Sequence, residues 1–339
     1  YGRWDVKIQT IMLQYGAPLR ESPDAIVTEY LPDTQTERIL LAFEFCNALP
    51  AGNQAWQRNG RALACASIGI PYLYYADLGG VELDEARNIK APRFPNPIIP
   101  FSYVSVGKTH DVLCLPVYLP SPSASDSIRM DFSRGFGAEE GKRIVKCILE
   151  SIPSKDIQEH LTDRALAVTE ILSSQRKRID TLRGRQWREL LSIVEPAKKA
   201  EWLQQKQILW SKKSSSKVLT TPTFSRLLHL AQECRAVSVG ANEIPICLIP
   251  SEMREYLSDE VSKLYGGSVN PDFLEWLASP QPLIAVWITG FKPGGEDSRP
   301  DRGLCPLARM LFGNEIDILS VVSGPAKVPM WKALEDSPE

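Results

Sequence analysis

Residues 24–78 constrain the fold of this chain more than any other segment. Two runs rich in β-branched and aromatic residues, 24–31 and 38–49, flank a short polar connection, which is the pattern of a β-hairpin. The apolar positions of the next segment suit a helix that begins near Gly52 or Asn53, and residues 71–80 are typical of a buried strand closed by two glycines. The predicted order is strand, strand, helix, strand.

The rest of the chain divides into a mixed, a helical and a second mixed region. Residues 81–100 are rich in proline and predict an ordered loop, and 101–108 and 111–119 predict two strands in a hairpin that turns at Thr109 and His110. Helices are expected at 139–152, 163–182 and 187–210. Beyond a linker at 211–223, the pattern indicates helices at 224–237 and 250–266 and strands at 244–250, 282–291 and 317–324. We therefore expect an α/β protein with domains at 1–135, 136–215 and 216–339.

Composition limits the chemistry that the chain can perform. Its 339 residues are 43% hydrophobic and have a net charge of -2, so a partner of strong charge would have to bind a local patch. The seven cysteines form no C-x-x-C pair, and three histidines form no H-E-x-x-H motif. Metal binding would therefore use carboxylates. Because no apolar run approaches the roughly 18 residues of a membrane span, we expect a cytoplasmic protein without a membrane partner.

Two acids of the predicted hairpin are candidates for a metal site. Asp24 lies at the start of the first strand and Glu44 lies in the second, so the hairpin would bring both to one end of the sheet. Strand alternation places Glu44 and Cys46 on one face, and Phe43, Phe45 and Asn47 on the other. An unpaired carboxylate in a strand core costs several kcal/mol, which favours a ligand role for Glu44. Alternatively, Pro23 and Asp24 form a turn and Glu44 is a partnered acid.

The segment 23–78 resembles the PD-(D/E)XK nucleases, with Pro23-Asp24 as the first element and Glu44 as the acid of the second. The resemblance implies a restriction-endonuclease-like core, a mixed sheet flanked by helices, followed here by a helical segment and a smaller C-terminal α/β unit. It implies that Asp24 and Glu44 bind Mg²⁺ or Mn²⁺ and that the enzyme is an endonuclease that cleaves DNA. Its setting would be a bacterial restriction or anti-phage defence system, in which the chain is a homodimer or a subunit of a defence complex.

This sequence departs from the family pattern at the lysine, because Cys46 occupies that position and Asn47 follows it. In some family members the role of the lysine has moved to the next helix. Four polar residues form one stripe of the helix predicted here, at the spacing i, i+3, i+4 and i+7: Gln54, Gln57, Arg58 and Arg61. We predict that Gln54, Gln57 or Arg58 supplies the missing contact and that Arg61 contacts nucleic acid.

A basic segment is a second candidate for nucleic-acid binding. Residues 175–217 contain twelve Lys or Arg and four Asp or Glu, a local balance of +8, with three tryptophans interleaved. Solvated helix faces over core tryptophans are the alternative interpretation. The predicted nucleic-acid contacts other than Arg61 lie in this segment and in the proline-rich loop at 81–100. They are Lys90, Arg93, Arg176, Lys177, Arg178, Arg183 and Arg185.

The loop at 294–304 contains a second Pro-Asp pair, and two interpretations stay open for it. Its charged residues form either a second functional cluster or a solvated loop that caps the predicted helix at 305–311. These residues are Glu296, Asp297, Arg299 and Asp301.

The sequence thus supports two main hypotheses of different class. The first is a metal-dependent endonuclease, and the second is a non-catalytic nucleic-acid-binding or assembly subunit that keeps a nuclease-like fold. A partner-docking module in residues 223–339 is a further possibility. Mg²⁺-dependent cleavage that is lost on chelation separates the first from the others.

The basic segment gives the first prediction. Replacing Arg176, Lys177 and Arg178 by glutamine should flatten the dependence of log affinity on log salt by up to about three units, because each phosphate contact contributes about one. Binding isotherms across a salt series measure this slope. An unchanged slope would mean that the cluster is a solvated face and that the contacts lie nearer Arg87, Lys90 and Arg93.

Overall fold

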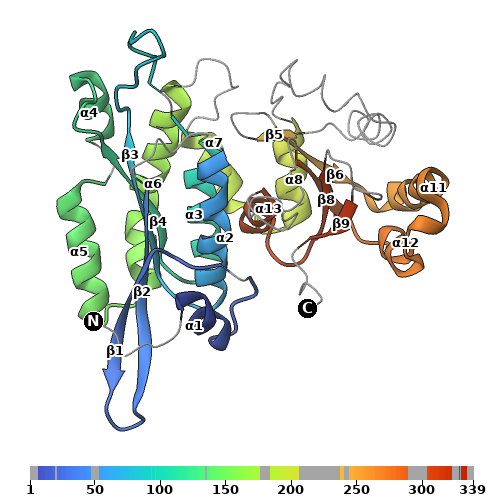
Figure 1. Ribbon diagram of the computed structural model, residues 1–339, viewed down its shortest axis with the longest axis horizontal. Coiled ribbons are helices and arrows are strands. Elements are labelled where there is room, and N and C mark those ends of the chain that lie inside the picture. The colour runs from blue at the N-terminus through green and yellow to red at the C-terminus, as the bar shows by residue number, and fades with distance from the viewer. Residues whose placement is uncertain are drawn as a thin grey trace. The chain divides into compact units, whose positions relative to one another are not determined.

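A computed structural model of the chain forms two compact units, residues 1–188 and 189–339 (Figure 1). It describes residues 7–19, 21–46, 53–92, 94–95, 97–133, 136–175, 184–205, 237–239, 244–288, 304–322, 328 and 330–333. Each unit contains a mixed β-sheet flanked by helices, so the predicted α/β class is confirmed. The helices of the predicted segment 136–215 are divided between the two units. The domain boundaries inferred from the sequence stay predictions.

The first unit is built on a four-stranded sheet of order β1-β2-β3-β4. Strands β1 (Ala25–Leu31) and β2 (Thr36–Cys46) form an antiparallel hairpin, as predicted, and β3 (Tyr72–Leu78) and β4 (Cys114–Pro120) follow in parallel. The helices are α1 (Ile8–Gln14), α2 (Asn53–Ser67), α3 (Ile98–Thr109), α4 (Asp126–Phe132), α5 (Ala138–Leu149), α6 (Ser154–Gln175) and α7 (Gly184–Ser192), with the unit boundary inside α7.

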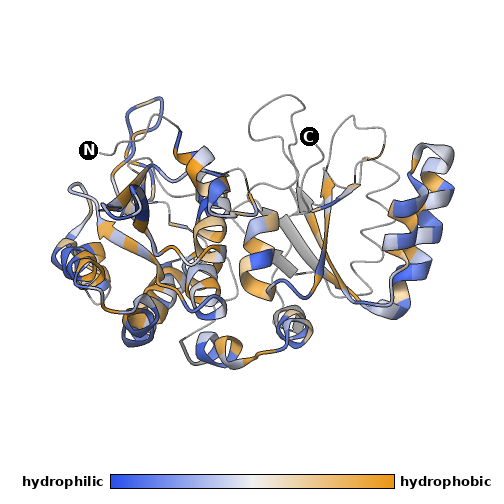
Figure 2. Cartoon of the chain, turned by 90° about the horizontal axis from the view of Figure 1, so that it is seen from below, coloured by the Kyte–Doolittle hydropathy of each residue, from blue (hydrophilic) through white to orange (hydrophobic). Residues whose placement is uncertain are grey.

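Helices cover both faces of this sheet, with α2 and α3 on one side and α5 on the other (Figure 1). Helix α2 begins at Asn53, as predicted, and its apolar segment Ala62–Ala66 is almost completely buried. Helix α5 is amphipathic: Ile144 and Ile148 are buried, while Lys142 and Lys146 are exposed. Figure 2 shows this division, with hydrophobic residues on the helix sides that face a sheet. None of the described helices is long and apolar enough to cross a membrane.

The structure corrects two predicted elements. The single helix expected at 187–210 is interrupted at residues 193–195, where α7 (Gly184–Ser192) ends before α8 (Pro196–Gln205) begins. The other correction concerns a predicted strand. Residues 101–108 lie in helix α3 and not in a strand, and the predicted hairpin at Thr109 and His110 is replaced by a parallel pairing of β3 with β4. A parallel pair needs a crossover, and α3 supplies it. Nearly every residue of α3 is buried, so its sequence is apolar all round and lacks the 3.6-residue period that identifies a surface helix. The second strand of the predicted hairpin is confirmed as β4.

The second unit has a five-stranded sheet of order β5-β6-β7-β8-β9, in which only β7 and β8 pair in parallel. The strands predicted at 244–250, 282–291 and 317–324 correspond to β6, β7 and β8, and the helix predicted at 250–266 is present. The helix predicted at 224–237 falls outside the described residues except at its last position. The elements are α8 (Pro196–Gln205), β5 (Val237–Val239), β6 (Ile244–Ile249), η1 (Ser251–Met253), α11 (Arg254–Tyr265), η2 (Gly266–Ser268), α12 (Pro271–Leu277), β7 (Leu283–Ile288), α13 (Leu304–Phe312), β8 (Asp317–Val322) and β9 (Met330–Lys332).

A buried arginine joins three elements of the second unit. Arg254, at the start of α11, is 0% exposed, and its guanidinium donates to the carbonyls of Leu277 at 2.8 Å and Gln281 at 2.7 Å. It also pairs with the carboxylate of Asp317 at 2.9 Å and lies over the ring of Trp276. These contacts satisfy carbonyl groups at the end of α12 that the helix itself leaves unpaired.

The second prediction follows from this arrangement. Arg254→Met should destabilise the protein by about 3 kcal/mol or more, because it removes the donor to the carbonyls of Leu277 and Gln281, and a polar group left unsatisfied in the interior costs about 1–3 kcal/mol. Chemical denaturation followed by circular dichroism measures the loss. Lys263→Met is the matched control, since the exposed Lys263 pairs with Glu260 three residues earlier in the same helix, and pairs at this spacing contribute about 0.2–0.5 kcal/mol. Equal effects of the two substitutions would contradict the assignment of Arg254 as a structural centre.

Candidate active site

The hairpin brings the carboxylates of Asp24 and Glu44 together. Ala25 pairs with Phe43, so Asp24 lies one step beyond the end of β1, beside Glu44 on β2. The Asp24 carboxylate accepts a hydrogen bond at 2.9 Å from the backbone N–H of Phe45. This bond occupies a donor of β2 that β1 does not reach, and it fixes Asp24 at the edge of the sheet. The predicted proximity of the two acids agrees with this geometry.

Helix α2 supplies two arginines to these acids. Arg61 Nη1 donates to Asp24 Oδ1 at 3.2 Å and also to Glu44 Oε1. Arg58 Nε lies 3.3 Å from the same Glu44 oxygen. Arg58 and Arg61 are three residues apart, which places both on the helix face that looks toward β2. One guanidinium nitrogen therefore joins the two carboxylates.

Glu21 is a third acid at the site, and sequence reasoning did not find it. Its Oε2 lies 3.9 Å from Arg61 Nε. A Cβ atom at Gly60 would lie only 3.1–3.2 Å from the Glu21 carboxyl group, so the glycine lets Glu21 approach the helix. The available signal was an acid three residues before Asp24, which by itself has no fixed spatial meaning in an irregular segment.

Burial controls the electrostatics of Glu44, whose side chain is 0% exposed. Burial raises the pKa of the Glu44 carboxyl group, and the hydrogen bond and charge of Arg61 oppose this effect. Burial by itself would lower the pKa of Arg61, but the bond to Glu44 raises it above its ordinary value. Within the described part of the chain, the second oxygen of Glu44 is buried without a hydrogen-bond partner. A buried carboxylate of this kind depends on nearby positive charge.

Aromatic side chains surround the acid pair on both faces of the sheet. Three tyrosines are buried on the Glu44 face: Tyr72, Tyr74 and Tyr103. Burial raises the pKa of each phenol, so these side chains carry no charge at neutral pH. On the opposite face, the ring of Phe45 stacks on that of Tyr75 at 5.7 Å and is 51% exposed. The strand alternation predicted for Glu44 and Cys46 against Phe43 and Phe45 is confirmed by their burial.

The other site residues predicted from the sequence differ in burial, and many lie outside the described residues. Cys46 is buried on the Glu44 face of β2, so a cysteine side chain stands where the resemblance would place the lysine. Lys90 is exposed in the loop after β3. Gln54 and Gln57 lie in α2 and Arg185 lies in α7, but their side chains are outside the described residues. The following predicted residues also lie outside them: Asn47, Arg93, Arg176, Lys177, Arg178, Arg183, Glu296, Asp297, Arg299 and Asp301.

The acid pair could offer a hard divalent cation two carboxylate ligands. No group of three metal-binding side chains occurs among the residues that the structure describes. Mg²⁺ is commonly held by one or two carboxylates together with substrate phosphates and retains several waters, so Asp24 and Glu44 could supply the protein ligands of such a site. Asp24 Oδ1 and Glu44 Oε1 both accept a hydrogen bond from Arg61 Nη1, so both acids stabilise a positive charge at that position.

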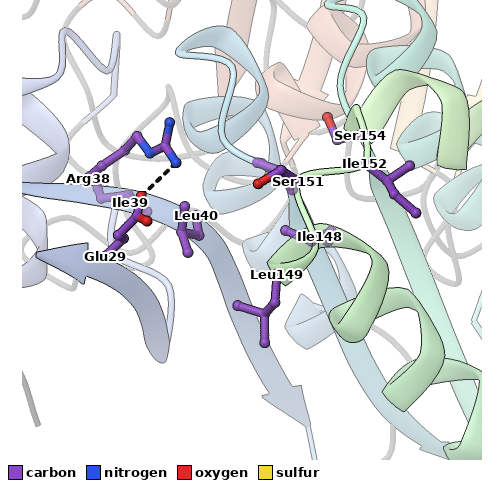
Figure 3. Close-up of a pocket in the computed structure, with 10 residues that line it drawn as sticks. Glu29, Arg38, Ile39, Leu40, Ile148, Leu149, Ser151, Ile152 and Ser154 are labelled. Atoms are coloured by element: carbon purple, nitrogen blue, oxygen red, sulfur yellow. Dashed lines mark hydrogen bonds and ion pairs between the residues drawn. The ribbon is translucent and has the colours of Figure 1, made fainter. Parts of the chain in front are cut away.

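A separate pocket of about 290 Å³ lies between the β1–β2 hairpin and the connection from α5 to α6 (Figure 3). The ion pair of Arg38 and Glu29, at 2.6 Å, stands on one side of it. Its described lining is otherwise mainly apolar and includes neither Asp24 nor Glu44. The pocket is therefore not part of the acid site.

Comparison of the chain with protein-family models, with curated proteins and with solved structures found no match. The mixed α/β class is thus established by the fold alone. The restriction-endonuclease-like core, the role of each site residue and the cytoplasmic location stay predictions.

Proposed function

We propose that the first unit is a metal-dependent endonuclease that cleaves DNA phosphodiester bonds. The observation that carries the proposal is the convergence of Asp24 and Glu44 from neighbouring strands, with their oxygens on one cationic nitrogen. Two converging carboxylates are ligands of the kind that hold Mg²⁺, and a bound Mg²⁺ would assist phosphodiester hydrolysis. The strand, strand, helix, strand order of the PD-(D/E)XK resemblance agrees with β1, β2, α2 and β3.

Each residue of the proposed site would have a separate role. Asp24 and Glu44 would hold Mg²⁺ or Mn²⁺, which when bound polarises a phosphoryl oxygen and lowers the pKa of a water. Arg58 stays beside Glu44 and limits the cost of burying its charge. Cys46 cannot supply the positive charge of the motif lysine, so the cationic role falls to the arginines of α2.

The biological setting rests on the resemblance. A bacterial restriction or anti-phage defence role, with the chain as a homodimer or as a subunit of a larger complex, agrees with a nuclease unit followed by a second α/β unit. The second unit would then bind a partner or the substrate.

One observation favours the alternative, a non-catalytic nucleic-acid-binding or assembly subunit. The ion pairs of Arg61 neutralise both acids, and the lysine of the motif is replaced by a buried thiol. A protein that had lost catalysis would keep such ion pairs because they stabilise the fold.

The third prediction separates the two functions. Asp24→Asn and Glu44→Gln should each lower Mg²⁺-dependent cleavage of plasmid DNA more than about 100-fold, since even groups that only orient metal ligands contribute about 10- to 100-fold. Cys46→Ser is the matched control on the same strand face and should cost little. Nicking and linearisation assays with Mg²⁺, Mn²⁺ or EDTA measure the effect. DNA binding by the unaltered protein without any cleavage would favour the alternative.

A further inference from the structure

The point between the two carboxylates is already taken by a cation that belongs to the protein. Arg61 Nη1 donates to both Asp24 and Glu44, which are the two oxygens that a divalent ion would use. A guanidinium and a metal ion cannot fill the same position. Arg61 is also 28% exposed, whereas Glu44 is fully buried, so the arginine lies on the solvent side of the acid that it neutralises.

We infer that Arg61 is the built-in counter-ion of the acid pair in the metal-free protein, and that a divalent cation binds by displacing its guanidinium toward Glu21. The inference rests on the proposed function, because it places the metal at Asp24 and Glu44. It adds a role that the sequence did not indicate, since Arg61 was expected to contact nucleic acid.

The surroundings of Arg61 provide for its displacement. Glu21 Oε2 already lies 3.9 Å from Arg61 Nε, so the guanidinium keeps an acidic partner when it leaves Asp24. The close approach of Glu21 to Gly60 holds that acid against α2. Arg58 remains 3.3 Å from Glu44 and continues to compensate its buried charge. The displaced guanidinium stays beside the metal, where its planar donors suit the phosphate of a substrate.

Competition between Arg61 and a metal follows from the ligands that they would share. Arg61 Nη1 contacts one oxygen of Asp24 and one of Glu44, the two acids proposed to hold the ion. Of the two arginines, only Arg61 bonds Asp24 as well as Glu44. Removing Arg61 should therefore free the metal position, whereas removing Arg58 should change only the neighbouring charge.

Mn²⁺ binding in the absence of nucleic acid tests the inference. Arg61→Gln should bind Mn²⁺ about tenfold more tightly or better, the equivalent of one hydrogen bond to a charged group, and should exceed any gain in Arg58→Gln. Isothermal titration calorimetry of the full chain measures both affinities. Thermal unfolding with and without Mn²⁺ gives a second readout, because the ion should stabilise Arg61→Gln more than the unaltered protein. Unchanged or weaker binding by Arg61→Gln would overturn the inference.

A double-mutant cycle with Glu21 tests where the guanidinium goes. Glu21→Gln should weaken Mn²⁺ binding when Arg61 is present and should have no effect in the Arg61→Gln background. Equal weakening in both backgrounds would mean that Glu21 acts as a ligand or a distant charge, and the displacement toward it would be wrong. If Arg61→Gln does not fold, Arg61→Lys replaces it and keeps a positive charge near the acids. A gain in affinity is still expected, because the lysine side chain ends one bond short of the position that Nη1 takes between the two carboxylates.

Failure of this inference can be told apart from failure of the proposed function. If Asp24→Asn and Glu44→Gln abolish Mn²⁺ binding while Arg61→Gln leaves it unchanged, the metal site stands and only the role of Arg61 is wrong. If those two acid variants bind Mn²⁺ as the unaltered protein does, the metal site itself is wrong.

Discussion

The first unit depends on the neutralisation of one buried carboxylate. Glu44 lies in the apolar second part of β2, between Ile39 and Cys46, and is completely buried, so its charge has to be compensated from another element. Arg58 and Arg61 provide that charge, and their spacing fixes the rotation of α2 over β2. The residues that follow in α2, Ala62–Ala66, are almost completely buried. One electrostatic requirement thus orients the helix that forms the wall of the candidate site.

The β1–β2 hairpin positions the second acid, Asp24, beside Glu44. Since β1 pairs with β2 only as far as Phe43, the next donor of β2 is free for Asp24. Asp24 is therefore tied to the backbone beside Glu44 and is more exposed than Glu44. A buried and an exposed carboxylate that share one cation form a site that solvent can reach from one side. In our proposal, this asymmetry makes Arg61 both the stabiliser of the acids and the group that a metal would displace.

The second unit also contains a buried charged side chain, but its charge is positive. This side chain is Arg254, and backbone carbonyls and Asp317 compensate its charge. All its described contacts serve packing at the ends of α12 and β8. Arg61, in contrast, is partly exposed and contacts three acids, which is why we propose a catalytic role for the first unit and not for the second.

The sequence by itself determined the elements whose patterns are local. The alternation of β2, the polar turn before it and the helix that begins at Asn53 were all predicted, and with them the nearness of Asp24 and Glu44. Helix α3 was missed because a segment buried on every side has no period to detect. The sequence also could not place Arg61 on both acids or Glu21 beside it. Those contacts join a loop, a strand and a helix, and their geometry depends on how α2 packs against the sheet. The tertiary structure decided this geometry, because packing between distant segments sets the distances between the charged groups.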